Sequence, residues 1–116
     1  MITTHILDTA AGRPARGVPV ELERLAESVF GTSSEWQAVG AGVTDNDGRN
    51  RELTPSGPVE PGTYRIRFKT GDYFAAQKVA GFFPVVEIQF TIEDGAQHYH
   101  VPLLLSPFGY STYRGS

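Results

Sequence analysis

The chain has 116 residues, of which 40% are apolar and 20% are charged, and its formal net charge is −3. This length predicts a single domain, residues 1–116, which buries roughly two-thirds of the surface of the unfolded chain. The negative net charge disfavours nucleic acid as a partner, because proteins of that class need a basic surface to neutralise phosphates. The sequence contains no cysteine, which excludes disulfides and thiolate metal sites.

The lysines and arginines are scattered, and no apolar stretch is long enough to cross a bilayer. The first residues, MITTHILD, lack the basic and apolar segments of a secretory signal. We therefore expect a cytoplasmic protein with no membrane partner.

Glycine and proline interrupt the chain at short intervals, and the runs between them are rich in Val, Ile, Thr and aromatic residues. This pattern predicts an all-β protein, a two-sheet antiparallel sandwich with Greek-key connections. The expected strands, in chain order, are 2–8, 18–25, 36–44, 49–53, 63–69, 85–92, 98–105 and 110–114.

One segment breaks the strand pattern and predicts a short helix over residues 73–80, which Asp72 caps and Gly81 ends. The strands 85–92 and 98–105 flank an Asp94-Gly95 turn signal. We expect these two strands to pair as a hairpin.

Side chains alternate across a strand, so the parity of each residue predicts the face that it occupies. In the strand 98–105, the odd-numbered residues are all apolar or aromatic and are expected in the core. His98 and His100 share the opposite face. We also expect Trp36, Tyr64 and Phe68 in the core.

The same parity places His5 on one face of the first strand and Tyr113 on one face of the last. If these strands neighbour 98–105 in one sheet, then His5, His100 and Tyr113 converge on the face away from the core. That face has few charges and carries Leu7 and Leu104. Exposed apolar patches of this kind indicate an interface, so self-association is expected through this face.

The histidines are the strongest candidates for acid–base chemistry, because imidazole titrates near neutral pH. A His-x-His pair on a strand also occurs in metal sites, and His98, His100 and His5 could together hold zinc. Alternatively, all three are ordinary surface histidines. The residue pattern alone leaves these alternatives open.

Arg49 follows an Asp-Gly turn and is either a solvated loop residue or a clamp for an anion or carbonyl group. Ser116 is either a nucleophile or part of a disordered terminus, and no Gly-x-Ser-x-Gly elbow surrounds it. Tyr113 more often packs than reacts, and Gly115 allows close approach of another backbone.

Three segments carry a more specific signal: THILDTAAGRPARGVPVEL near the start, TDNDGR in the middle and HYHVPLLLSPFGYSTYRGS at the end. With these segments the chain resembles the transthyretin-related 5-hydroxyisourate hydrolases, and the resemblance extends over the full chain. The final Tyr-Arg-Gly-Ser is the most specific motif. Transthyretin, a carrier, shares the fold and the LLSP and YST portions but lacks YRGS, so the chain resembles the enzymes more than the carrier.

The resemblance implies a prealbumin-like sandwich of two four-stranded sheets, about eight strands in all, with one short helix. It also implies a homotetramer, a dimer of dimers, with active sites in a central channel. The implied activity is that of a cyclic amide hydrolase, which converts 5-hydroxyisourate, formed when urate is oxidised, to 2-oxo-4-hydroxy-4-carboxy-5-ureidoimidazoline. No metal or organic cofactor is implied. The alternative is a transthyretin-like carrier that binds small aromatic ligands in the same channel.

The resemblance further implies which residues form the site. The catalytic positions match His5, Arg49, His100 and Ser116, whereas His98 matches a less critical position. We expect a histidine, His100 in the first instance, to deprotonate a water that attacks a ring amide, while His5 holds the water or protonates the leaving nitrogen. Arg49 offsets charge on the carbonyl oxygen. The substrate-binding residues implied are His5, Arg49, Tyr113, Arg114, Gly115 and Ser116.

Overall fold

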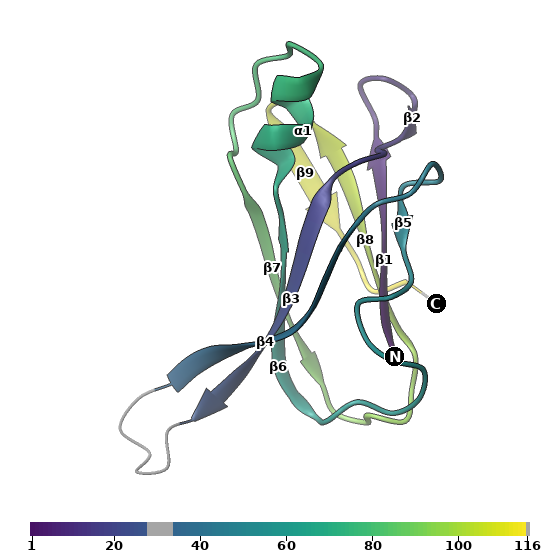
Figure 1. Ribbon diagram of the computed structural model, residues 1–116, viewed down its shortest axis with the longest axis vertical. Helices are drawn as coiled ribbons and strands as arrows, with labels where there is room; N and C mark the ends of the chain where they lie inside the picture. Colours follow the sequence, from purple (N-terminus) through teal and green to yellow (C-terminus); the bar gives the residue numbers. More distant parts are fainter. Residues whose placement is uncertain (28–33, 116) are drawn as a thin grey trace.

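The computed structural model describes residues 1–27 and 34–115, which form two β-sheets packed face to face with one short helix at an end (Figure 1). The first sheet has the strand order β2 (Arg13–Pro14), β1 (Ile2–Asp8), β8 (Tyr99–Ser106), β9 (Gly109–Thr112), and β5 (Arg49–Asn50) also pairs with β1. The second sheet has the order β4 (Ser34–Val43), β3 (Pro19–Glu27), β6 (Gly62–Phe68), β7 (Val86–Ile92). No helix in the described part of the chain is long and apolar enough to span a membrane.

The predicted two-sheet sandwich is confirmed, with two differences in the sheets. The first sheet has five strands rather than four, because the two-residue strands β2 and β5 both pair with β1. The pairing of β1 with β8 is parallel, so the sandwich is not wholly antiparallel.

The predicted hairpin between 85–92 and 98–105 is wrong, because β7 pairs with β6 whereas β8 pairs with β1 and β9. The turn at Asp94-Gly95 exists, and the Asp94 carboxylate accepts a hydrogen bond of 3.0 Å from the N–H of Ala96. Gly95 lies against the backbone of Val59, whose N–H donates to the Gly95 carbonyl at 2.9 Å. This contact lies in the connection that leads from β7 in the second sheet to β8 in the first.

The helix α1 spans Thr70–Ala76, so it begins and ends earlier than the sequence predicted. Asp72 lies in its first turn and does not cap it, since Lys69 occupies the N-cap position. The helix ends in a Schellman arrangement around Lys78, which has a φ of 58°. Gly81 therefore lies beyond the end of the helix.

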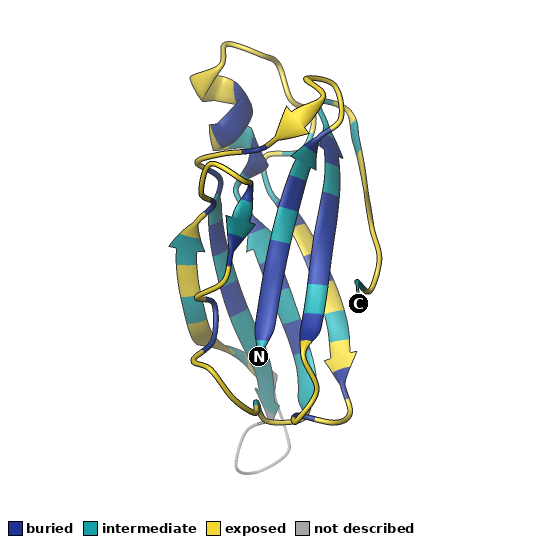
Figure 2. Cartoon of the chain, turned by 90° about the vertical axis from the view of Figure 1, so that its right-hand side faces the viewer, coloured by how far each residue is buried: buried dark blue, intermediate teal, exposed yellow. Residues whose placement is uncertain are grey.

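The core lies between the sheets and follows the predicted alternation. In β8, Tyr99, Val101, Leu103 and Leu105 are between 0% and 6% exposed, as expected (Figure 2). Between them lie the half-buried His100 and Leu104 and the buried Pro102. From the other sheet, Tyr64 and Phe68 are buried as predicted. The full core cluster is Ile2, Ile6, Ala15, Val18, Val20, Leu22, Leu53, Tyr64, Ile66, Phe68, Tyr73, Phe74, Val86, Ile88, Ile92, Tyr99, Val101, Leu103 and Leu105.

The prediction that Trp36 lies in the core is wrong. Its side chain is only partly buried, and the guanidinium of Arg65 stacks 4.3 Å from the ring centroid. The register of β3 against β4 shifts between Leu22 and Glu23, which changes the face presented beyond that point.

The outer faces of the two sheets differ in charge. The outer face of the second sheet carries ion pairs, among them Arg65 with Glu23 at 2.9 Å and Arg67 with Glu87 at 2.8 Å. The outer face of the first sheet carries histidines, leucines and a proline instead. Only the second has the charged surface of an ordinary solvent-facing sheet.

A tight turn precedes β5 and fixes its position beside β1. The Asp45 carboxylate accepts hydrogen bonds from the N–H groups of Asp47 at 2.9 Å and Arg49 at 3.0 Å. Gly48 has a φ of 73°, and its carbonyl accepts a hydrogen bond of 2.7 Å from the N–H of Ile6. A Cβ at position 48 would lie 2.4 Å from the Ile6 carbonyl oxygen, so only glycine fits without displacement.

We predict that Gly48→Ala destabilises the protein more than Gly12→Ala. Both glycines have positive φ, which costs a substituted residue about 1–2 kcal/mol, but nothing lies within 4 Å of a Cβ at Gly12. The clash at position 48 adds about 1–3 kcal/mol to the loss. Urea unfolding of the two variants measures the difference, and equal stabilities would contradict the packing argument.

Candidate active site

The sheet register brings His5, Arg49 and His100 to the outer face of the first sheet. Parallel pairing of β1 with β8 places Thr3 opposite His100 and His5 opposite Pro102. Antiparallel pairing with β5 places Arg49 opposite His5. The strands that carry His5 and His100 are therefore neighbours, which is the condition for their convergence on one face, and three side chains from distant parts of the chain meet.

Thr3 links the two histidines of the His-x-His segment. Its hydroxyl oxygen lies 2.8 Å from Nε2 of His98 and 2.9 Å from Nδ1 of His100, and its side chain is only 6% exposed. Sequence reasoning missed Thr3 as a site residue. Parity placed it on the face of His5, but only the β1–β8 register sets it opposite His100.

The segment after β9 returns to His100. The N–H of Gly115 donates to the His100 carbonyl at 2.8 Å, and a Cβ at Gly115 would lie 2.6 Å from Cδ2 of the imidazole. Arg114 donates to Oε1 of Gln97 at 2.8 Å, and its guanidinium lies 4.5 Å from the ring centroid of Tyr99. These contacts hold the tail against β8, and glycine is the residue that lets it approach.

Of the other two predicted tail residues, Tyr113 and Ser116, the structure describes only Tyr113. Tyr113 is 59% exposed, so its ring is available at the surface rather than packed. Ser116 lies outside the described residues.

Two shallow pockets adjoin at His100. One, of about 250 Å³, is lined by Met1, Thr3, Thr4, Arg49, Arg51, His98 and His100. The other, of about 210 Å³, is lined by Ile88, Gln89, Phe90, Thr91, Tyr99, His100, Val101, Thr112, Tyr113 and Arg114. The first is basic and the second is mainly apolar, so His100 stands between a charged wall and an aromatic one.

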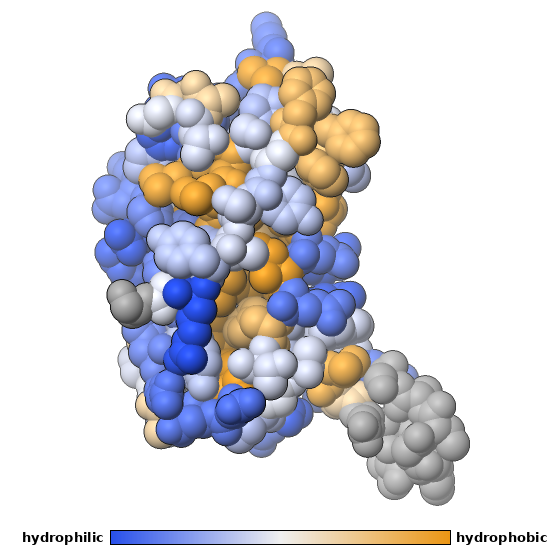
Figure 3. Space-filling view, turned by 180° about the vertical axis from the view of Figure 1, so that it is seen from behind, coloured by the Kyte–Doolittle hydropathy of each residue, from blue (hydrophilic) through white to orange (hydrophobic). Residues whose placement is uncertain are grey.

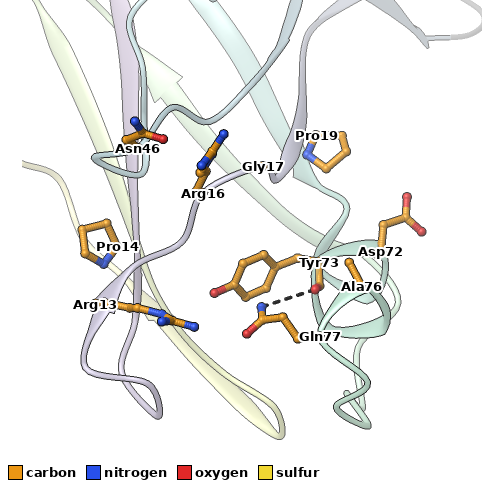
Figure 4. Close-up of a pocket in the computed structure, with 10 residues that line it drawn as sticks. All are labelled: Arg13, Pro14, Arg16, Gly17, Pro19, Asn46, Asp72, Tyr73, Ala76 and Gln77. Atoms are coloured by element: carbon orange, nitrogen blue, oxygen red, sulfur yellow. Dashed lines mark hydrogen bonds between the residues drawn. The ribbon is translucent and has the colours of Figure 1, made fainter.

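A larger pocket of about 680 Å³ lies elsewhere, between α1 and the β2 region (Figure 4). Arg13, Arg16, Tyr73 and Gln77 are among its lining residues, and the Gln77 amide donates to the Tyr73 carbonyl at 3.4 Å. None of the predicted site residues lines it. Size alone therefore does not locate the chemistry in this molecule.

The electrostatic environment favours neutral imidazoles. Burial lowers the pKa of both His5 and His100 below 6.5, and the positive charge of Arg49 lowers each further. His5 and His98 add to the lowering of the pKa of His100. Since the unfolded chain binds these protons more tightly, this contribution to stability is complete above pH 6.5 and is lost as the pH falls from 6.5 through the lower pKa values of the folded protein.

Metal binding was one sequence-based alternative for the histidines. Within residues 1–27 and 34–115, no group of three or more His, Cys, Asp or Glu side chains is arranged to hold a metal ion. What the site offers is two bases of lowered pKa, a guanidinium and a hydroxyl, a set suited to acid–base chemistry on a polar carbonyl compound.

Comparison with known proteins gives consistent matches. The family model for Transthyretin, described as the HIUase/Transthyretin family, matches residues 2–115. A 5-hydroxyisourate hydrolase of Salmonella dublin is 47% identical over 116 residues, which cover 100% of this chain and 81% of that protein.

Two solved structures extend the comparison. The 5-hydroxyisourate hydrolase of Klebsiella pneumoniae has a TM-score of 0.82 at 36% identity, and the match covers 99% of this chain and 98% of that one. Sea bream transthyretin in complex with thyroxine has a TM-score of 0.86 at 32% identity, covering 98% and 93%. The fold is therefore shared by an enzyme and a carrier, and the site residues must distinguish them.

We predict that Arg49→Gln raises the pKa of His5 and of His100, because it removes a positive charge beside both. Burial and the other two histidines persist in the variant, so the pKa of His100 remains below 6.5. Arg49→Lys keeps the charge and should leave both pKa values near those of the wild type. NMR titration of the imidazole signals measures these shifts, and unchanged values in Arg49→Gln would contradict the assigned cause.

Proposed function

The chain belongs to the HIUase/Transthyretin family, and from this premise we propose that it hydrolyses 5-hydroxyisourate by attack of water on a ring amide carbonyl. The observation that carries the proposal is the meeting of His5, Arg49 and His100 on one sheet face, with Gly115 in contact with His100. A neutral imidazole can act as a general base on water and a guanidinium can stabilise an oxyanion, roles that hydrolysis uses and ligand carriage does not.

His100 acts as the general base. Its lowered pKa keeps the imidazole neutral at pH 7, so a nitrogen lone pair is available to take a proton from water. General base action of this kind typically contributes about 10²–10⁴-fold to a rate. His5, beside Arg49, holds the attacking water or protonates the leaving ring nitrogen.

Arg49 stabilises the negative charge that develops on the carbonyl oxygen as water attacks. The turn at Asp45 and Gly48 holds its backbone, so the cation is positioned before the reaction begins. A preorganised donor of this kind is worth about 10²–10³-fold in rate. The positive charge of Arg49 also disfavours protonation of His5 and His100. One side chain therefore stabilises the oxyanion and keeps the imidazoles neutral.

The tail supplies the substrate-binding side of the site. Tyr113 offers an exposed aromatic ring beside the apolar pocket, and Gly115 fixes the backbone against His100. Arg114 holds the tail through Gln97. Ser116, which lies outside the described residues, remains predicted to bind substrate, and the cytoplasmic location likewise stays a prediction.

A homotetramer, built as a dimer of dimers, completes the site. Ligand pockets usually measure about 300–1,000 Å³, whereas the two pockets at His100 are smaller and open. The face that carries them has half-buried leucines instead of the ion pairs of the opposite face. Hydrophobic side chains also gather at the α1 end of the molecule (Figure 3). Phe82, which follows α1 in the chain, is 69% exposed.

The proposed activity is tested by following the ultraviolet decay of freshly generated 5-hydroxyisourate. We predict that the wild-type chain accelerates this decay and that His100→Asn lowers kcat/KM by at least about 10²-fold, the contribution of a general base. Removal of residues 113–116 should have a similar effect. Decay at the spontaneous rate in the presence of wild-type protein, with the ligand bound unchanged, would establish a carrier instead.

We predict that the protein sediments as a species of four times the 12.6 kDa chain. Leu104→Glu should dissociate the tetramer and reduce the activity, because burying an unpaired charge at an interface costs on the order of several kcal/mol of association free energy. Gln37→Glu, on the exposed face of β4, is the matched control and should leave the assembly intact. An active wild-type monomer would overturn the assembly proposal but not the activity.

A further inference from the structure

We propose that Thr3 and His98 form a proton relay behind His100, so that the charge gained in catalysis comes to rest on His98. The inference rests on the proposed hydrolase function. It assigns roles to two residues that the family resemblance leaves out or treats as less critical. It follows from the geometry of one hydroxyl group between two imidazoles.

The single hydroxyl proton of Thr3 constrains the hydrogen bonds that His98 and His100 can make. The Thr3 hydroxyl has one proton, yet it lies within 2.9 Å of a nitrogen on each of His98 and His100. It can donate to only one of them, so the other histidine must donate an N–H to the hydroxyl oxygen. The protonation states of the two rings are therefore coupled through Thr3.

The tautomer that suits catalysis follows from this coupling. His100 donates its Nδ1–H to Thr3, and Thr3 donates its O–H to Nε2 of His98. This leaves Nε2 of His100 with a free lone pair, which is the base that water needs. A valine at position 3 would fill nearly the same volume, so the hydroxyl contributes the hydrogen bonds rather than the packing.

The surrounding charges decide which ring holds the added proton. Charge on His100 is disfavoured by burial and by Arg49, His5 and His98, whereas His98 is exposed to solvent. Among residues 1–27 and 34–115, the basic groups that line the two pockets or lower the pKa of His100 are the amino terminus of Met1, His5, Arg49, Arg51 and Arg114. These groups and burial disfavour a positive charge on His100, so the charge is better placed on the solvated ring.

The relay moves protons away from the reacting water and then returns them to the leaving nitrogen. Water forms a bond to the carbonyl carbon and gives its proton to Nε2 of His100, while the Nδ1 proton of His100 moves to Thr3 and the Thr3 proton moves to Nε2 of His98. The ring C–N bond then breaks, and the leaving nitrogen takes the proton from Nε2 of His100. The relay runs backwards from His98 through Thr3, and each protein group recovers its starting state.

The kinetic test compares variants at Thr3 and His98. We predict that Thr3→Val and His98→Gln each lower kcat by about 10–10²-fold, part of the usual acid–base contribution, with little change in KM. The double variant should be no slower than Thr3→Val, because both changes break one relay. Thr3→Ser should restore most of the rate. Thr9→Val, which also loses one hydroxyl hydrogen bond but touches no histidine, is the matched control.

Two readouts separate a relay from simple positioning of the ring. Dependence of kcat on the fraction of D₂O should curve in the wild type, where several protons move together, and should become linear in Thr3→Val. His98→Gln with wild-type kcat would overturn the proposal, since a merely positioned His100 needs no second ring. Additive losses in the double variant would also overturn it.

The tautomers can be measured without turnover, which separates this inference from the proposed function. Nitrogen NMR should find His100 protonated at Nδ1 and His98 unprotonated at Nε2, and this pairing should disappear in Thr3→Val. The opposite pairing would reject the relay even if the hydrolase activity is confirmed.

Discussion

The parallel pairing of β1 with β8 is the constraint on which the rest of the structure depends. It brings a histidine near the start of the chain beside one near its end, and it sets Thr3 opposite His100. A slip of β1 by one residue would turn Thr3 and His5 toward the core and the buried Ile6 toward solvent. The hydrophobic core therefore fixes the site, because the same two strands supply both.

The site uses a sheet face on which charge is scarce. The second sheet covers its outer face with ion pairs, but the first leaves two partly buried imidazoles near the guanidinium of Arg49, which a turn holds. Partial burial keeps the rings neutral, and the guanidinium reinforces that effect while it remains available to a developing oxyanion. Strands and a tight turn hold these groups more precisely than flexible loops would.

Much of the fold could be predicted from local pattern, since strand alternation separated Tyr99 and Leu103 from His98 and His100 correctly. The failures were at positions where a local signal fits more than one long-range arrangement. Asp94-Gly95 forms a turn whether the chain makes a hairpin or crosses between sheets. Trp36 was predicted in the core, but a register shift turned it toward Arg65.

By itself the sequence determined the alternation of faces, the turn before Arg49 and the motifs that place the chain in its family. These depend on covalent geometry and on residue identity, which act over a few neighbours. Only the tertiary structure decided that Thr3 joins His98 to His100 and that Gly115 lies against the imidazole. Those contacts join residues more than ninety positions apart or bring the tail back onto β8, and the packing of the two sheets, a property of the whole chain, selects them.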